Sequence, residues 1–346
     1  MSTSLPWLQD QPDGLRDLPE GRLDAAARIL RDAAGAGQRI VLAGHIGPDA
    51  DALGSVLALH EVLQGLGARS LPVIGESPLS VPANLAWLPH ATRLVGADAL
   101  PDRDELEILV TLDAASPDRL GAVTALLDGP ATVVMVDHHA SGQPFGDLAL
   151  VAPGAASTTQ VLAALIARMG VALTPSMATC LYAGLVADTG RFGYSSSDGS
   201  TLRLAGELVD AGADHVQVHR RLFATRTLAE LDLLAAALGR LRFLPEHRLV
   251  HTHVTARELA ASGANGEATE HLVDVVRWAD VAEVTLVAKP GPDDTWRVSL
   301  RSEGGVDVGR LAGRFGGGGH QRAAGFTRAG QVKDVVAEVV AALGER

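Results

Sequence analysis

Histidines and aspartates follow apolar segments at four separate places in the chain. Side chains of these types resist burial unless another group compensates their charge or polarity. Taken singly, each place also fits a simpler role, such as a helix cap, a surface histidine or an Asp-Gly helix end. The eight residues are His45, Asp49, Asp51, Asp113, Asp137, His138, His139 and Asp188.

Considered together, these residues predict a metal centre. If the preceding strands belong to one parallel sheet, their carboxyl ends meet at the same edge, where the side chains would converge. Carboxylates gathered there without compensation would repel each other and take up protons, a cost that divalent cations remove. A set of carboxylates and imidazoles without a thiol favours Mn²⁺ or Mg²⁺ over Zn²⁺ or Co²⁺. Two metals about 3.5–4 Å apart, bridged by a carboxylate, are a common arrangement for in-line displacement at phosphorus.

The elements that would position these residues alternate between strand and helix. Apolar runs predict strands at Arg39–Ala43, Ser70–Ile74, Ile108–Leu112 and Thr132–Val136. Helical spacing and N-cap signals predict helices at Leu23–Ala34, Ala52–Leu66, Ser157–Met169 and Ser176–Val186. This order is typical of an α/β protein with a parallel sheet.

The pattern changes after a long Ala/Leu helix expected at Thr227–Leu241. Strands are predicted beyond it at Arg248–Val254, Val281–Ala288 and Trp296–Arg301. We therefore expect a parallel-sheet domain at residues 20–226, a helical connector at 227–245 and a smaller α/β domain at 246–346. Within the last domain, the glycine-rich segment 313–326 is expected to be a loop whose backbone N–H groups can approach an anion closely.

Composition limits the possible partners and the location. The 346 residues carry a formal net charge of -12 and no basic tract, which disfavours binding of long nucleic acid and favours a small anionic substrate. The single cysteine, Cys180, excludes an intrachain disulfide framework. No apolar run approaches the roughly 20 residues that span a bilayer, and the N-terminus lacks the pattern of a signal peptide. A cytoplasmic protein without membrane contact is expected.

Five sequence motifs carry a resemblance to a known family. "HIGPDADALGS", "TLDAAS", "VDHHAS" and "VADTGRFGYSSS" resemble, in order and spacing, the four motifs of the DHH phosphoesterase family. "RFGGGGHQRAAGF", preceded by "VSLRS", resembles the signature of the DHH-associated C-terminal domain. The resemblance extends from about residue 20 to the end. The one departure is Ala50, where many relatives have Gly between the two aspartates. The two-domain layout is similar to the NrnA-type enzymes, which act as oligoribonucleases and pAp phosphatases.

The resemblance implies a role for each of the eight residues. One Mn²⁺ would be held by His45, Asp49 and Asp113. The other would be held by Asp51, Asp113, His138 and Asp188, so that Asp113 bridges the two ions. Mg²⁺ or Co²⁺ could substitute. His139 would face the substrate phosphate, and Asp137 would orient an imidazole. Asp113, Asp137 and His139 are thus the expected catalytic residues.

Substrate contacts are expected from two other places. The resemblance implies that Arg301, Gly317, Gly318, Gly319 and His320 hold the phosphate and base of a terminal nucleotide. Arg191 closely follows Asp188, so it is a further candidate for a phosphate contact. Relatives of this type suggest a homodimer.

The expected activity is hydrolysis of very short oligoribonucleotides, pApA-like linear dinucleotides and pAp to mononucleotides by metal-hydroxide attack. One alternative is a cyclic di-AMP phosphodiesterase of the same family. A second, from a different class, is a catalytically inactive nucleotide-sensing module. A RecJ-like DNA exonuclease is disfavoured by the small size and the excess of acid, and an inorganic pyrophosphatase by the glycine-rich segment.

Overall fold

The computed structural model describes residues 6–7, 12–140, 142–263, 269 and 271–344, without the side chains of Asp13 and His320. The chain divides into two compact units, Met1–Thr225 and Arg226–Arg346.

The first unit is built on a five-stranded sheet in which every neighbouring pair is parallel, in the order β2-β1-β3-β4-β5. The four strands predicted from sequence are confirmed, whereas β5 was not predicted. Its sequence, LALV, is an apolar run of only four residues, and Leu150 alone among them is buried. The strands are β1 Arg39–Gly44, β2 Arg69–Ile74, β3 Ile108–Leu112, β4 Thr132–Asp137 and β5 Leu148–Val151.

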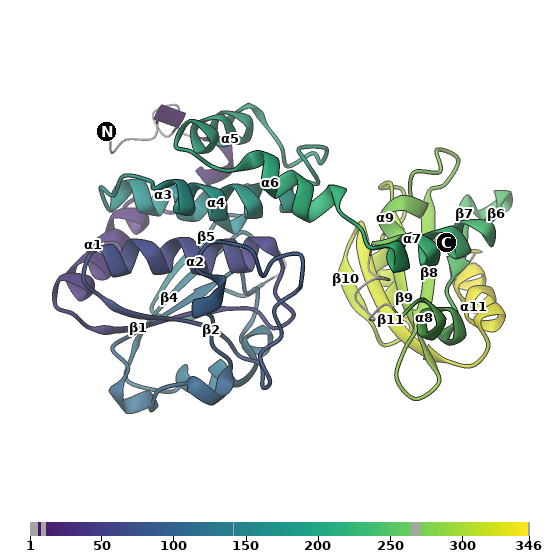
Figure 1. Ribbon diagram of the computed structural model, residues 1–346, viewed down its shortest axis with the longest axis horizontal. Coiled ribbons are helices and arrows are strands. Elements are labelled where there is room, and N and C mark those ends of the chain that lie inside the picture. The colour runs from purple at the N-terminus through teal and green to yellow at the C-terminus, as the bar shows by residue number, and fades with distance from the viewer. Residues whose placement is uncertain (1–5, 8–11, 141, 264–268, 270, 345–346) are drawn as a thin grey trace. The chain divides into compact units, whose positions relative to one another are not determined.

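Both faces of this sheet are covered, which explains why its inner strands are apolar at nearly every position. Alternate β1 residues separate into two cores: Ile40 and Leu42 pack against the helices, whereas Val41 and Ala43 pack against the 3₁₀ segment Pro117–Leu126. Helices α1–α4 lie together on one side of the sheet (Figure 1). The helices of this unit are α1 Arg22–Gly35, α2 Ala50–Gly65, α3 Thr158–Arg168, α4 Pro175–Asp188, α5 Gly199–Asp210 and α6 His215–His219.

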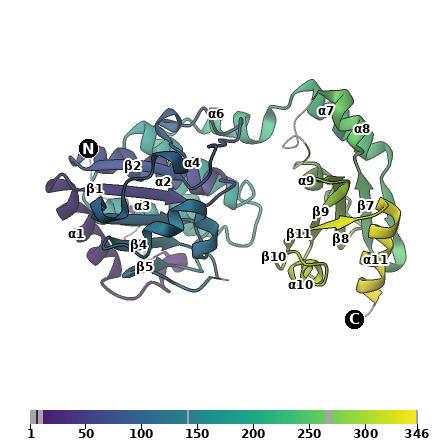
Figure 2. The same ribbon diagram turned by 90° about the horizontal axis from the view of Figure 1, so that it is seen from below.

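The second unit contains a six-stranded mixed sheet in the order β10-β11-β9-β8-β7-β6, in which β7 and β8 form the parallel pair. Helices α10 and α11 share one apolar core with the sheet, and α7 and α9 share another. Figure 2 shows α9 and α11 on opposite sides of the sheet. The strands are β6 Arg242–Leu244, β7 Leu249–His253, β8 Val284–Pro290, β9 Thr295–Ser302, β10 Gly318–His320 and β11 Ala323–Ala329. The helices are α7 Leu228–Gly239, α8 Ala256–Ser262, α9 Leu272–Val276, α10 Val308–Gly313 and α11 Val332–Gly344.

The long Ala/Leu helix is confirmed as α7, which begins after a capping box formed by Thr227 and Glu230. Its residues Leu233 and Ala237 are buried in a core of the second unit. The assignment of residues 227–245 as a connector between domains stays a prediction.

The glycine-rich segment differs from the expected loop. Residues Gly318–His320 form an edge strand that pairs with β11. The hairpin requires bare backbone, because a Cβ on Gly317 would collide with the carbonyl oxygen of Gly325. A Cβ on Gly319, whose φ is 142°, would lie 2.5 Å from the carbonyl oxygen of Ala323. These two glycines therefore permit close strand packing.

No helix in the described part of the chain is long and apolar enough to cross a membrane.

Candidate metal centre

The loop from β1 to α2 places the first two candidate ligands. Asp49 is the N-cap of α2, and its Oδ1 accepts hydrogen bonds from the backbone of Asp51 and Ala52 at 2.9 and 3.0 Å. Its Oδ2 lies 3.7 Å from Nε2 of His45. The cap role and the ligand role are therefore compatible, because each uses a different oxygen. His45 Nδ1 lies 2.9 Å from the carbonyl oxygen of Ile46, and donation to that oxygen leaves a lone pair on Nε2.

Asp113 lies at the centre of the cluster. Its Oδ2 is 3.6 Å from Nε2 of His45, and its Oδ1 is 3.8 Å from Nε2 of His138. The two oxygens of one carboxylate thus face two different histidines, which is the arrangement a bridging ligand needs. Asp113 also has a φ of 60°, a conformation that is uncommon for a non-glycine residue and is concentrated at functional sites.

The remaining candidate ligands are placed by three elements: the end of β4, the first turn of α2 and the last residue of α4. Nε2 of His138 lies 3.0 Å from Oδ2 of Asp188, the last residue of α4. Asp51, in the first turn of α2, is completely buried and accepts hydrogen bonds from the backbone of Thr158 and Thr159 at 2.6 and 3.0 Å. Those two N–H groups belong to the start of α3, where the helix dipole favours a carboxylate.

The described residues contain three groups whose ligand atoms all lie within 4.8 Å of one another. Two of the groups match the ligand sets implied by the family resemblance, apart from the sharing of Asp113. The groups are His45, Asp49 and Asp113; Asp51, His138 and Asp188; and Asp113, His138 and His139.

Asp137 holds the two histidines that follow it. Its Oδ1 accepts hydrogen bonds from the backbone of His138 at 2.8 Å and from Nδ1 of His139 at 2.7 Å. Nδ1 of His138 lies 3.2 Å from the carbonyl oxygen of Ala155, so its Nε2 is directed at Asp113 and Asp188. The imidazoles of His138 and His139 therefore have different hydrogen-bond partners, as expected if His138 binds metal and His139 does not.

The protonation of the cluster favours a bound cation. Burial, reinforced by neighbouring carboxylates, raises the pKa of Asp51 and Asp113 to about 7 and that of Asp188 to about 6. Burial lowers the pKa of His138, but Asp188 and the other carboxylates outweigh it and raise the pKa to about 10. Without another charge, these groups would retain protons that metal ligands must lose. Divalent cations would compensate the carboxylates in place of these protons. The oxygen and nitrogen donors fit Mn²⁺ or Mg²⁺.

Three residues near the cluster were not anticipated from sequence. Nη2 of Arg119 lies 3.0 Å from Nδ1 of His45, and Thr158 Oγ1 donates to Asp113 Oδ1 at 2.9 Å. In the sequence, Thr158 and Thr159 are recognisable only as part of a helix start. Arg119 sits in a 3₁₀ segment whose sequence carries no periodic signal that would have identified it.

Arg191 lies in the same unit, but its contact in the structure is with an aromatic ring. Its guanidinium carbon is 5.2 Å from the centre of the Phe223 ring, a cation–π geometry. Phe223 belongs to a short π-helical segment, Arg220–Ala224. To bind a phosphate, the Arg191 guanidinium would have to move away from the Phe223 ring or contact the ring and the phosphate at the same time.

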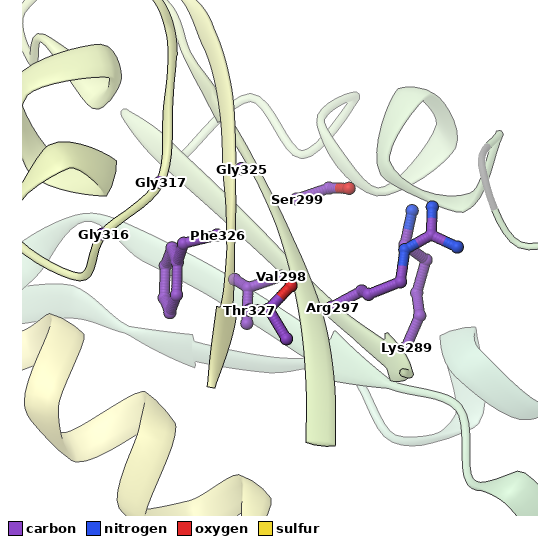
Figure 3. Close-up of a pocket in the computed structure, with 9 residues that line it drawn as sticks. All are labelled: Lys289, Arg297, Val298, Ser299, Gly316, Gly317, Gly325, Phe326 and Thr327. Atoms are coloured by element: carbon purple, nitrogen blue, oxygen red, sulfur yellow. The ribbon is translucent and has the colours of Figure 1, made fainter. Parts of the chain in front are cut away.

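The candidate substrate residues of the second unit lie around the β9–β11–β10 end of its sheet. Arg301 on β9 lies directly opposite Ala323, with Nε 3.7 Å from Oδ1 of Asp274. Gly317 borders a cavity of about 420 Å³, and Gly318 pairs with Gly325 (Figure 3). Gly319 pairs with Ala324 in the same hairpin. The side chain of His320 lies outside the described part of the structure.

Comparisons with known proteins give the same family for both units. Residues 39–185 match the DHH family N-terminal domain, and residues 251–345 match the DHHA1 domain. A bifunctional oligoribonuclease and PAP phosphatase NrnA from Thermus thermophilus is 31% identical, with 84% of each chain covered. A cyclic-di-AMP phosphodiesterase GdpP from Geobacillus thermodenitrificans is 27% identical, with 87% of this chain and 47% of that protein covered.

Solved structures agree on the fold. An exopolyphosphatase-related protein from Bacteroides fragilis has a TM-score of 0.88 at 23% identity, covering 95% of this chain and 97% of that chain. RecJ from Thermus thermophilus in complex with Mn²⁺ has a TM-score of 0.56 at 19% identity, covering 96% of this chain and 55% of that chain. With the family matches and the NrnA relative, the conclusion is plain: the chain belongs to the DHH family of phosphoesterases, with a DHH domain followed by a DHHA1 domain.

Proposed function

We propose that this phosphoesterase is a Mn²⁺-dependent hydrolase of very short oligoribonucleotides, linear dinucleotides such as pApA, and pAp. The observation that carries the proposal is the position of Asp113, whose two oxygens face histidines of two separate ligand groups. This arrangement supports two ions on one carboxylate, as displacement at phosphorus requires. The substrate class is supported by the NrnA relative, a bifunctional oligoribonuclease and PAP phosphatase.

The ligands of the two ions follow from the groups described above. His45, Asp49 and Asp113 would hold one ion, and Asp51, Asp113, His138 and Asp188 the other. Two divalent ions there would supply Lewis-acid chemistry and neutralise the charge of the phosphate. The donors suit Mn²⁺ or Mg²⁺, and RecJ, a protein of the same fold, has been solved with each of these ions.

His139 would act on the phosphate from beside the ligands. Its hydrogen bond with Asp137 is the main cause of a raised pKa, which favours the imidazolium form. With Nδ1 donating to Asp137, the second ring N–H can donate to a phosphoryl oxygen as negative charge develops there. The fixed Asp137 carboxylate prevents the ring from turning away. Arg119 adds a positive charge beside His45 at the same centre.

The second unit would hold the other part of the substrate. Arg301, Gly317, Gly318, Gly319 and His320 are proposed to bind a terminal nucleotide. Because the glycines lack side chains, an anion can approach this edge of the sheet closely, although the N–H of Gly317 itself donates to the carbonyl oxygen of Ala312 at 3.0 Å. Of these residues, Gly317 borders the cavity described above.

Two alternatives make different predictions. A cyclic di-AMP phosphodiesterase is supported by the GdpP relative, although the chain covers only 47% of that protein. A catalytically inactive nucleotide sensor would bind the same ligands without hydrolysis. Parallel assays with Mn²⁺ on pAp, pApA, cyclic di-AMP and RNA dimers would separate these functions. We expect AMP from pApA and pAp, and slower conversion of cyclic di-AMP.

Variants identify the source of the activity. Asp113→Ala and His138→Ala are expected to abolish AMP release from pApA, whereas Asp128→Ala, which removes an exposed carboxylate, should retain it. Undiminished hydrolysis by Asp113→Ala would contradict the proposed centre. Binding of pApA by the wild-type protein without hydrolysis would favour the sensor.

A further inference from the structure

One face of the second unit's sheet carries a row of polar side chains that the DHH assignment does not explain. Strand register places Lys289 on β8 directly opposite Arg297 on β9, and Arg297 opposite Thr327 on β11. Ser299 and Arg301 are two and four residues after Arg297 on β9, so they lie on the same face of the sheet as Arg297. The face therefore has cations at both ends and a hydroxyl between them.

This face is not covered by an apolar core at β9 and β11. The core shared with α7 and α9 includes Val287 of β8 but no residue of β9 or β11 among those described. The other face of the same strands is buried under α10 and α11 through Val298, Leu300 and Phe326. The polar row is thus the side of β9 and β11 on which a ligand can lie, and at the Arg301 end that ligand would share the guanidinium with Asp274 of α9, 3.7 Å away.

A cavity opens at the Arg297 end of the row. Its volume of about 420 Å³ is within the range of small-ligand sites, and Lys289, Arg297, Ser299 and Thr327 border it (Figure 3). Arg297 is exposed, whereas Lys289 is only 2% exposed and adds a second positive charge behind it. Both cations also make other contacts in the structure, so an incoming phosphate would compete for them.

The length of the row determines the class of ligand. Arg297 and Arg301 are four residues apart on one strand, which corresponds to a separation of about 13 Å. A single phosphate group cannot reach both ends. An extended polyanion can, and the sugar–phosphate backbone of a single strand has this form.

We propose that the Arg297–Lys289 end of β9 binds a second backbone phosphate, so that the DHHA1 domain holds oligoribonucleotides longer than two nucleotides along this strand. This inference rests on the proposed function, from which it takes the terminal nucleotide at Arg301. The added contact would favour a trimer or tetramer over pApA through affinity, with Ser299 donating to the backbone between the two cations.

The test measures binding by the full-length protein, without hydrolysis. A fluorescently labelled RNA tetramer and labelled pApA are titrated in EDTA by fluorescence anisotropy over a range of salt concentrations. Loss of one phosphate contact reduces the slope of log K against log salt by about 0.7 for a single strand. For Arg297→Gln we expect this reduction with the tetramer and a clearly smaller one with pApA. Lys289→Gln should act in the same direction, with its folding checked by thermal melting.

Arg328→Gln is the matched control. Arg328 is an exposed cation on β11, but its Nε pairs with Glu338 of α11 at 2.8 Å, on the covered side of the sheet. An unchanged tetramer slope in Arg297→Gln, an equal change in Arg328→Gln, or no tetramer binding by the wild-type protein would overturn the inference. Hydrolysis of the tetramer with Mn²⁺ is assayed separately. Its absence would contradict the proposed function without altering the binding result.

Discussion

At the scale of single residues, neighbouring side chains of one type have different environments. His138 donates from Nδ1 to a backbone carbonyl and directs Nε2 at Asp113 and Asp188, whereas His139 is hydrogen bonded to Asp137. The ring centres are only 4.7 Å apart. The hydrogen bonds, rather than the positions alone, therefore support different roles for the two histidines.

The first prediction separates these roles. His138→Ala should lower Mn²⁺ affinity by at least about 100-fold, because even the loss of a residue supporting a ligand costs about 10–100-fold. His139→Ala should keep Mn²⁺ affinity close to that of the wild type while kcat falls about 10²–10³-fold, the usual cost of removing one donor to developing negative charge. Mn²⁺ binding is measured by calorimetry and kcat by AMP release.

The control for this pair is His247→Ala, a histidine of the second unit outside every candidate ligand group among the described residues. Equal loss of Mn²⁺ from His138→Ala and His139→Ala would show that both rings bind metal.

At the scale of elements, the centre depends on how closely α2 approaches α4. A Cβ on Gly54 of α2 would collide with the backbone oxygen of Cys180 on α4. A Cβ on Gly184 of α4 would lie 2.6 Å from Oδ1 of Asp51. Glycines in both helices therefore bring Asp51 and the end of α4 to the same place. This contact could not be anticipated, since a glycine within a helix has no sequence signal that distinguishes close packing from chance.

The second prediction concerns this contact. Gly54→Ala should lower the free energy of unfolding by about 1–3 kcal/mol, because the added methyl group meets backbone that cannot move aside. The matched control is Gly206→Ala in α5, where a Cβ would meet no atom within 4 Å. There, the greater helix propensity of alanine should stabilise the protein by up to about 1 kcal/mol. Urea unfolding measures both, and a loss of equal size in the two variants would contradict the packing explanation.

The third prediction concerns His60, on the buried side of α2. Its Nδ1 lies 2.8 Å from Oγ of Ser70 on β2. Burial is the main cause that lowers its pKa to about 4, and the nearby His90 and Arg93 lower it further against the opposing charge of Glu61. Since the pKa of an unfolded histidine is about 6.5, the unfolded chain binds more protons between pH 4 and 6.5. The contribution of His60 to stability is complete above pH 6.5 and decreases as the pH falls towards 4.

Urea unfolding with Mn²⁺ present, at pH 4.5, 5.5 and 7.5, measures this effect. His60→Gln cannot take up that proton, so its stability should fall less steeply with decreasing pH than that of the wild type. Parallel curves for the two proteins would exclude a role for His60 in the pH dependence.

At the scale of the whole molecule, the acidic and imidazole side chains of the candidate metal centre lie at one edge of the sheet in the first unit. Strand order places β1, β3 and β4 side by side, and their carboxyl ends lead to His45, Asp113 and His138, while Asp51 and Asp188 come from the start of α2 and the end of α4. In the second unit, by contrast, the basic side chains Lys289, Arg297 and Arg301 lie on one face of the sheet. A metal ion should therefore stabilise the first unit alone.

The fourth prediction follows from this distribution. Calorimetry of the full-length protein should show that Mn²⁺ raises the melting temperature of the transition of unit Met1–Thr225. The corresponding gain in free energy of unfolding is about 2.7 kcal/mol when free Mn²⁺ is 100 times Kd. The stabilisation should be larger at pH 8 than at pH 6. The pKa values of Asp51 and Asp113 are raised to about 7, so protons compete with the ion at the lower pH.

Asp113→Asn serves as the control, because it should retain the fold while losing most of the Mn²⁺ effect. A shift of similar size in both transitions, or an unaltered shift in Asp113→Asn, would place the ion elsewhere.

The amino-acid sequence by itself determined the repeated strand–helix order, the parallel sheet and the residues that gather at its edge. Apolar periodicity is a local property, and a polar tip after a buried strand is visible without a structure. The six candidate ligands found in this way fall into two groups of three, and within each group the ligand atoms lie within 4.8 Å of one another.

Only the tertiary structure decided how the ligands are oriented and supported. The left-handed conformation of Asp113, the pairing of Asp137 with His139 and the approach of Arg119 to His45 join segments far apart in the chain or depend on exact backbone direction. The glycine-rich segment became an edge strand because its partner, β11, lies only a short turn away and accepts bare backbone. Such contacts follow from packing between elements, and the pattern within one segment does not encode them.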